Sequence, residues 1–200
     1  MRRIFLAACA ASLVASCPAF HFASHGVEAS TVLRLDVEDL VARCDVGLEG
    51  RVASKQVRVD AQGRIETEYV VRVERTFWGA PLVERTIRLP GGVLPDGRGL
   101  VIPGMPSLAE GEVALLFLSA ENARGARMPI GLAQGRLRVV TNAVGEKSVQ
   151  RDAGVLDLVE ANGAPSVSSP KSALAYDGTI ARIDAARAAR LAREKNGGTR

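Results

Sequence analysis

Histidine and cysteine are nearly absent from this chain. Its two histidines, His21 and His25, lie within the first 25 residues, and Cys44 is the only cysteine after Ser30. Histidine is the commonest general base, and histidine and cysteine are the usual zinc ligands. The sequence therefore argues against a zinc centre, a cysteine–histidine catalytic pair and an internal disulfide beyond residue 30. Calcium-loop, phosphate-loop and dinucleotide-binding motifs are absent as well, so we expect no metal and no cofactor.

Long hydrophobic runs are missing except near the N-terminus. Residues 1–3 are Met-Arg-Arg and residues 4–15 are almost wholly apolar, the pattern of a secretory signal. A membrane-spanning helix needs about 20 apolar residues, so we predict an exported protein without a transmembrane span. Cleavage after Ala29 would give a periplasmic or secreted protein. Cleavage before Cys17 fits the lipoprotein pattern and would give a membrane-anchored protein lipidated at Cys17.

Excess positive charge is confined to the two ends of the chain. The whole chain has a formal net charge of +4. Residues 179–200 hold six basic and two acidic residues, so this segment alone has a net charge of +4. Residues 1–29 contribute two basic residues and one acidic residue, a net +1, which leaves −1 for residues 30–178. The main body therefore has no cationic attraction for nucleic acid, and we expect no nucleic-acid partner.

Aromatic residues are scarce, at 4% of the chain, whereas glycine is abundant at 20 residues, a composition that favours short strands over helices. Residues 65–77 alternate with the two-residue period of a half-buried strand, with Thr67, Tyr69, Val71, Val73 and Phe77 on one face. Residues 113–118 are apolar throughout, which predicts a central strand covered on both faces. Further strands are predicted over residues 46–52, 83–89, 100–102, 130–133, 136–140 and 147–151.

The order of these segments predicts the domain organisation. Residues 1–29 are the expected signal peptide, 30–160 a β-domain, 161–178 a linker rich in Ala, Ser, Pro and Gly, and 179–200 a basic helix. Asp36 is placed to cap a short helix that ends at Arg43. Five to seven strands without alternating helices predict a mainly β fold, a small closed or partly open barrel with a short N-terminal helix and a C-terminal helix.

Two features are candidates for a binding surface. The first is the sequence Trp78-Gly79-Ala80-Pro81, which holds the only tryptophan and would either anchor a partner or cap the end of the barrel. The second is a loop over residues 90–107, rich in proline and glycine, of a length that is often functional. Leu100, Ile102 and Met105 supply apolar surface in this loop, either for a partner or for packing across the barrel mouth.

Catalytic alternatives find less support in the sequence. Glu66, Glu68 and Glu74 alternate with the apolar residues of the 65–77 strand, so we interpret them as a solvated face with cross-strand partners rather than as glycosidase carboxylates. Ser168 and Lys171 have Ser-x-x-Lys spacing but include Pro170 and lie in the linker, whereas this motif requires a buried helix. A hydrolase that uses carboxylates or a serine without histidine is retained as an alternative function.

Several short motifs carry a resemblance to known proteins. They are Ala42-x-Cys44-Asp45-x-x-x-x-Gly50-x-Val52, Val71-x-Val73-Glu74-x-x-x-Trp78-Gly79, Leu89-Pro90-Gly91-Gly92, Pro103-Gly104-x-Pro106, Gly111-Glu112-Val113-x-Leu115-Leu116-Phe117-Leu118 and Gly131-Leu132-Ala133-Gln134-Gly135. Over roughly residues 40–151 the chain resembles a group of uncharacterised bacterial exported proteins. The layout is similar to OB-like barrels and, more distantly, to the barrel of tissue inhibitors of metalloproteinases. Those inhibitors act through an N-terminal cysteine and are rich in disulfides. This chain has neither feature, so the resemblance implies a fold and no inhibitory residues.

The leading hypothesis from the sequence is an exported, non-enzymatic binding or interaction module. Its expected contact surface combines the Trp78 loop and the 90–106 loop, and its partner is an unknown protein or envelope component. An envelope lipoprotein with a structural role, anchored through Cys17, is the remaining alternative.

Overall fold

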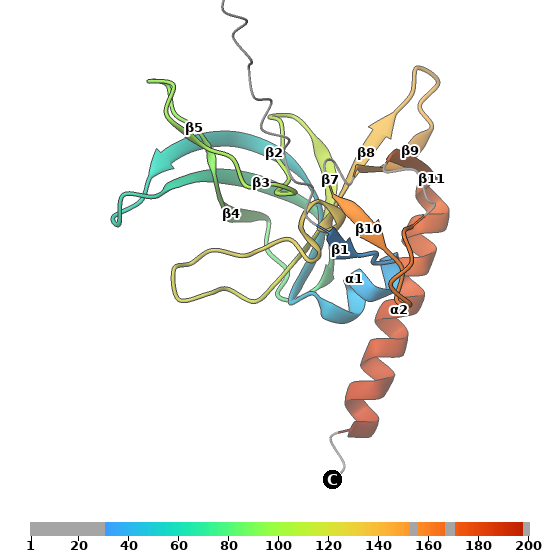
Figure 1. Cartoon of the computed structure of the whole chain (residues 1–200). Coiled ribbons are helices and arrows are strands. Elements are labelled where there is room, and N and C mark those ends of the chain that lie inside the picture. The colour runs from blue at the N-terminus through green and yellow to red at the C-terminus, as the bar shows by residue number, and fades with distance from the viewer. Residues whose placement is uncertain (1–30, 153–155, 167–170, 198–200) are drawn as a thin grey trace, which may run out of the picture.

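The structure, a computed structural model, describes residues 31–152, 156–166 and 171–197. Its main element is a seven-stranded antiparallel sheet with the strand order β11-β9-β8-β7-β2-β3-β4 (Figure 1). The strands are β2 (Val46–Val59), β3 (Ile65–Trp78), β4 (Glu84–Pro90), β7 (Val113–Leu118), β8 (Arg136–Thr141), β9 (Lys147–Asp152) and β11 (Lys171–Ala175). The mainly β prediction is thereby confirmed.

Four short strands form two small additional sheets. The pairs are β1 (Thr31–Leu33) with β10 (Asp157–Val159), which run parallel, and β5 (Gly92–Val93) with β6 (Gly99–Leu100), which run antiparallel. The helices are α1 (Val37–Arg43), α2 (Tyr176–Gly197) and the short 3-10 helix η1 (Leu132–Gly135). None of the helices in the described part of the chain is both long and apolar enough to cross a lipid bilayer.

The sequence predicts a closed or partly open barrel. The sheet is not closed into a barrel, so the closed form is wrong, and an OB-like fold is not confirmed. Strands β4 and β11 are the two ends of the sheet and do not pair with each other. The physical reason is that the sheet has a separate core on each face, whereas a small closed barrel has a single interior. Alternating hydrophobicity shows that one face of a strand is buried, but it does not show whether the outer strands meet.

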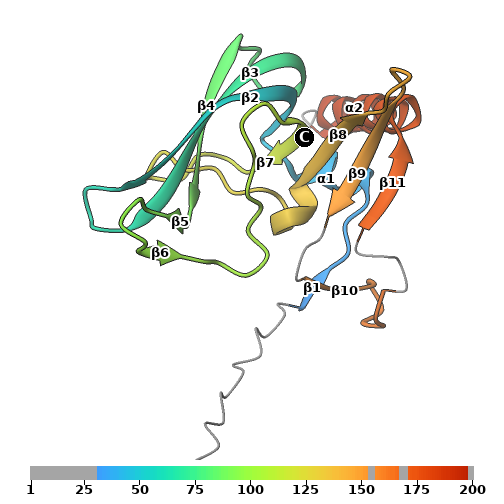
Figure 2. The ribbon, with the colours of Figure 1, turned by 90° about the horizontal axis from the view of Figure 1, so that it is seen from above.

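The first face, which we call the helix face, is covered by α1 and α2 (Figure 2). Its core combines buried side chains of both helices with those of β7, β8 and β9. Among its members, the largest fully buried side chains are Leu40, Leu115, Phe117, Leu137 and Ile183.

The opposite face, which we call the loop face, has its own core. That core is built on β2, β3, β4 and β7 and includes Leu48, Tyr69, Ile87 and Leu116. Because β7 contributes alternate residues to both cores, the prediction that residues 113–118 are covered on both sides is confirmed.

Register shifts change which face the residues of β3 occupy. Gly50 of β2 pairs with Val73, whereas the neighbouring Glu49 pairs with Arg75, so Glu74 is an extra residue in β3. Such a bulge reverses the alternation of side chains along the strand. Tyr69 and Val71 therefore lie in the core of the loop face, whereas Phe77 lies in the core of the helix face. The prediction that these residues share one face is wrong for Phe77.

Two further segments differ from the predictions. Residues 130–133 were expected to form a strand, but the chain turns there and η1 follows, with left-handed backbone at Gly131 (φ 66°) and Leu132 (φ 58°). The buried Gln134 side chain stabilises this turn by accepting a hydrogen bond from Leu35 N (2.8 Å) and donating one to the Leu33 carbonyl (2.9 Å). Strand β2 continues to Val59 rather than ending at Val52, because it pairs with β3 along its whole length.

The C-terminal region also differs in its boundaries. Helix α2 begins at Tyr176, three residues before the predicted start, and β11 lies within residues predicted as a linker. Antiparallel pairing of β11 with β9 gives this segment its extended structure. The expected signal peptide, with Cys17, His21 and His25, lies outside the described residues, as does Ser168.

Candidate functional site

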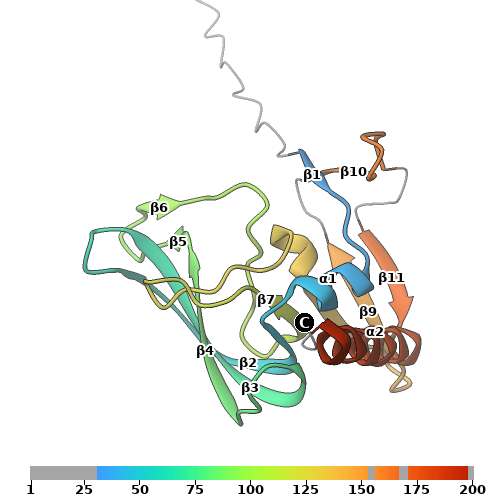
Figure 3. The ribbon, with the colours of Figure 1, turned by 90° about the horizontal axis from the view of Figure 1, so that it is seen from below.

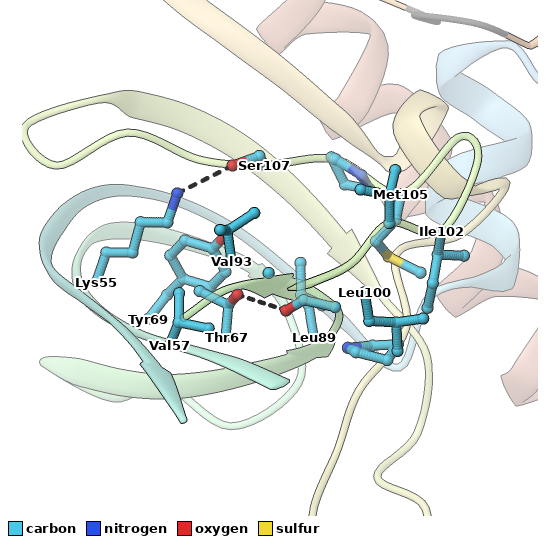
Figure 4. Close-up of a pocket in the computed structure, with 15 residues that line it drawn as sticks. Lys55, Val57, Thr67, Tyr69, Leu89, Val93, Leu100, Ile102, Met105 and Ser107 are labelled. Atoms are coloured by element: carbon cyan, nitrogen blue, oxygen red, sulfur yellow. Dashed lines mark hydrogen bonds between the residues drawn. The ribbon is translucent and has the colours of Figure 1, made fainter. Parts of the chain in front are cut away.

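A cavity of about 380 Å³ lies on the loop face, between the sheet and residues 90–107 (Figure 4). We call it the loop groove. Strands β2, β3 and β4 form its floor, and the loop with the β5–β6 hairpin forms its outer wall. Its lining consists of Lys55, Val57, Thr67, Tyr69, Leu89, Pro90, Gly91, Gly92, Val93, Leu100, Val101, Ile102, Met105, Pro106 and Ser107.

Hydrogen bonds hold the loop in place at both ends. The Thr67 hydroxyl donates to the Gly91 carbonyl (2.6 Å), and the Gly91 amide donates to the Ile65 carbonyl (2.9 Å). At the other end, the Ala133 amide of η1 donates to the Gly104 carbonyl (2.8 Å). The outer wall is therefore anchored to β3 on one side and to η1 on the other.

Gly92 allows the loop to approach the sheet closely. Its φ of +137° is a conformation that residues with a side chain rarely adopt. A Cβ atom at this position would lie 2.5 Å from the Thr67 hydroxyl oxygen and 2.7 Å from a methyl carbon of Val57. The Pro-Gly-Gly sequence at the end of β4 therefore determines how closely the loop approaches the sheet.

The groove has a buried floor and an exposed apolar rim. Thr67, Tyr69 and Leu89 on the floor are buried, whereas Val93 is 60% and Val101 82% exposed. Large apolar side chains that stay in water at the mouth of a cavity are typical of binding surfaces.

Among the residues that the structure describes, Lys55 is the only charged one that lines the loop groove. Its ammonium nitrogen donates a hydrogen bond to the Ser107 hydroxyl (3.1 Å) and lies 5.9 Å from the centre of the Tyr69 ring. The phenol oxygen of Tyr69 in turn accepts a hydrogen bond from the Leu108 amide (3.4 Å). Lys55 and Ser107 are both exposed, so a bound molecule can reach them.

The structure brings together three of the four binding residues predicted from the sequence. Leu100, Ile102 and Met105 all line the loop groove. Trp78 lies instead in a separate cavity of about 340 Å³ beside α2, lined also by Arg187 and Leu191. The two loops therefore do not form the single contact surface that the sequence suggested.

Trp78 packs between the sheet and α2. The guanidinium of Arg190 lies 3.8 Å from the centre of its ring, and the half-buried ring contacts the core of the helix face. Arg190 also donates hydrogen bonds to the carbonyls of Val41 (2.8 Å) and Cys44 (2.7 Å), at the end of α1. This contact joins α1, α2 and β3, as expected for a tryptophan that closes one end of the fold.

Further polar groups lie on the helix face, away from the loop groove: the buried Cys44 thiol and the hydrogen-bonded pair of the half-buried Tyr176 and the buried Glu49. Burial raises the pKa of the Cys44 thiol to about 11, so the thiol stays protonated at neutral pH. The Tyr176 hydroxyl donates to the carboxylate of Glu49, which is only 2% exposed, at 2.8 and 2.9 Å. Burial, together with this carboxylate, raises the pKa of Tyr176 to about 12. These groups connect secondary-structure elements and do not line the loop groove.

The carboxylates of β3 have arginine partners. Glu66 pairs with Arg58 (3.0 Å), and Glu68 pairs with Arg58 (2.7 Å) and Arg88 (2.8 Å). Glu74 lies 3.8 Å from Arg51. These contacts agree with the interpretation of the three glutamates as a surface with cross-strand partners. In the described ranges, no cluster of three or more His, Cys, Asp or Glu residues could hold a metal ion.

Five lining residues on β2, β3 and β4 were not predicted as site residues from the sequence: Lys55, Val57, Thr67, Tyr69 and Leu89. Tyr69 and Thr67 were assigned to an inward face, but nothing in the sequence shows that the 90–107 loop folds over them. Lys55 and Val57 lie in the part of β2 that was not predicted as a strand. A signal exists there, because the polar residues 54–56 lead into the alternating Val57-Arg58-Val59.

Comparison with protein-family models gives no match for this chain, and comparison with curated protein sequences gives none either. The proposed function therefore rests on the geometry and chemistry of the loop groove.

Proposed function

We propose that this chain is an exported, non-enzymatic binding module and that its ligand lies in the loop groove. The observation that carries the proposal is an anchored loop that leaves a cavity of about 380 Å³ over a buried floor. Small-molecule sites are typically clefts of roughly 300–1,000 Å³ with mostly apolar walls and a few polar groups. The export part of the proposal is supported by the basic start and the apolar run of residues 1–15.

A fluorescent apolar probe tests this proposal on the purified protein. N-phenyl-1-naphthylamine is uncharged and becomes fluorescent when it leaves water, so its titration measures binding to an apolar groove. We expect saturable binding that Val101→Asp weakens by about threefold to tenfold, because the substitution puts a charge on the apolar rim. Val144→Asp is the matched control, since Val144 is 79% exposed but lies outside the groove.

The proposal fails if the probe does not bind, or if the Val101 and Val144 variants lose affinity equally. Circular dichroism and thermal unfolding of both variants establish that the fold is intact.

The contact between Lys55 and Ser107 favours a second candidate, a histidine-independent acyl hydrolase. With Lys55 neutral, its amine would take the proton of the Ser107 hydroxyl as the oxygen attacks an acyl carbonyl. That proton would then pass to the leaving alcohol, and water would release the acyl group from Ser107. Such chemistry needs a desolvated lysine, whereas Lys55 and Ser107 are both exposed, so binding is the better supported function.

Hydrolysis of 4-nitrophenyl esters with acyl chains of different length separates the two candidates. A hydrolase would show turnover that Ser107→Ala abolishes. A binding module would release no more 4-nitrophenol than the Ser107→Ala variant does.

A further inference from the structure

The loop groove is polar at one end and apolar at the other. Figure 4 shows Lys55 and Ser107 together at one end, while Leu100, Ile102 and Met105 lie toward the other. A ligand that fills the groove would therefore meet a cation and a hydroxyl at one end and hydrocarbon along the rest of its length.

The charge of Lys55 has no acidic partner within ion-pair distance among the described residues. The nearby carboxylate of Glu110 accepts a hydrogen bond from the backbone amide of Lys55 (2.9 Å), not from its ammonium group. The ammonium contacts only neutral groups, the hydroxyl of Ser107 and the ring of Tyr69. Arg58 and Arg88, on the side of the sheet opposite the groove, are by contrast paired with glutamates.

Within the described part of the chain no carboxylate lines the groove, so an anionic ligand would meet attraction from Lys55 without repulsion from these walls. We propose that the ligand of the loop groove is a small amphiphilic anion, with an apolar body and one negatively charged head group. The head group accepts hydrogen bonds from the Lys55 ammonium and the Ser107 hydroxyl. The body lies over Leu89 and against Leu100, Ile102 and Met105.

This inference rests on the proposed function, because it names the class of ligand for the same groove. A small molecule fits better than a segment of a partner protein for two reasons. The cavity has the volume of a small-ligand site, and its exposed polar side chains, Lys55 and Ser107, lie together at one end. An extended peptide would instead present polar backbone groups along the apolar part of the groove.

Two probes with the same aromatic skeleton test the role of charge. One is 8-anilinonaphthalene-1-sulfonate, which carries a single sulfonate, and the other is the uncharged N-phenyl-1-naphthylamine. We expect the sulfonate probe to displace the uncharged probe, which shows that they share a site. Lys55→Gln should weaken binding of the sulfonate probe by about fivefold to tenfold and change binding of the uncharged probe by less than about twofold.

The controls are a distant lysine and a conservative variant. Lys147→Gln removes a positive charge on β9, outside the groove, and should leave both affinities unchanged. Lys55→Arg keeps the charge and should retain most of the affinity for the sulfonate probe. Dodecanoate and dodecyl phosphate, compared with dodecanol as competitors of the uncharged probe, then distinguish a carboxylate head from a phosphate head.

The outcomes separate this inference from the proposed function. If the uncharged probe binds but Lys55→Gln does not change the affinity for the sulfonate probe, the anionic ligand is ruled out. The proposal that the loop groove is a binding site is then retained. If Lys55→Gln weakens both probes equally, Lys55 only shapes the groove and the inference fails. If neither probe binds the wild-type protein, the proposed function fails as well.

Discussion

The helix face and the loop face belong to the same sheet but are closed in different ways. On the helix face, α1 and α2 are held by Arg182–Glu38 (2.8 Å), Tyr176–Glu49 and the stacking of Arg190 on Trp78. On the loop face, residues 90–107 are anchored near Gly91 and at Gly104, and leave a cavity between these anchors. Figure 3 shows the two covers on opposite sides of the molecule.

The difference shows how a cover determines what a sheet face can do. A helix presents a stripe of side chains that packs closely against a sheet and excludes ligands. A loop rich in proline and glycine has fewer large side chains, so it can span the sheet without filling the space beneath. We therefore expect substitutions on the helix face to change stability, and substitutions on the loop face to change binding.

We expect the largest difference in the free energy of unfolding between two isoleucine substitutions, one on each face. Ile183 of α2 is fully buried, so Ile183→Ala should lower the free energy of unfolding by about 2–5 kcal/mol. Ile102→Ala, in the half-buried lining of the loop groove, should cost less than about 2 kcal/mol and weaken binding of N-phenyl-1-naphthylamine. Urea denaturation and probe titration measure both quantities. If Ile183→Ala weakens binding of the probe as much as Ile102→Ala does, the expected difference between the two faces is contradicted.

The next largest effect concerns Trp78, which the sequence suggested as a binding residue. Trp78→Ala removes its stacking with Arg190 and its contact with the core, so the free energy of unfolding should fall by about 1–3 kcal/mol. Binding of the uncharged probe should remain unchanged, because Trp78 does not line the loop groove. A loss of probe affinity in a stably folded Trp78→Ala protein would show that the two sites are coupled.

Gly92 provides a test from the loop side. Gly92→Ala would force a Cβ atom against Thr67 and Val57 at a backbone conformation unfavourable for alanine. The expected cost is about 1–2 kcal/mol of stability, together with at least a tenfold loss of probe affinity as the wall moves from the floor. Gly97→Ala is the control for a left-handed glycine in the same loop with open space around it. Equal loss of affinity in both variants would rule out a specific role for Gly92.

These predictions also show how far the sequence was informative. The strands over residues 65–77 and 113–118 were predictable because their patterns depend on local alternation. So was the short helix after Asp36, whose backbone amide donates to the Asp39 carboxylate (3.1 Å). Leu100, Ile102 and Met105 were identified because a long apolar loop is unusual in itself.

Other features depend on contacts between distant segments. The open sheet, the reversal of Phe77 by a bulge and the extension of β2 to Val59 all arise from strand pairing that no local pattern specifies. Trp78 is separated from the loop groove because it packs against α2. Its partner Arg190 lies 112 residues later in the sequence (190 − 78), so no local pattern could show this contact. Lys55 was not predicted as a lining residue, because its contacts with Ser107 and Tyr69 form only when these distant segments come together in the fold.

The smallest effect is the pH dependence of an exposed contact on the helix face. The hydrogen bond from Arg182 lowers the pKa of Glu38, so the native state holds this proton less tightly than the unfolded state. The contribution is present above the ordinary pKa of a glutamate and is lost as the pH falls through the lowered native pKa. Arg182→Gln should therefore cost less than about 0.5 kcal/mol at pH 7 and a smaller amount at pH 3, by urea denaturation at both pH values. An equal cost at both pH values would exclude the ionic contribution.

The most direct test is to locate the bound probe by NMR of methyl groups while the protein is titrated with N-phenyl-1-naphthylamine. We predict saturable shifts at the methyl groups of Val57, Leu89, Leu100 and Ile102, with those of Leu40 and Ile183 unchanged. Shifts centred on Leu191 beside Trp78, or spread over both faces of the sheet, would contradict a ligand site under the 90–107 loop.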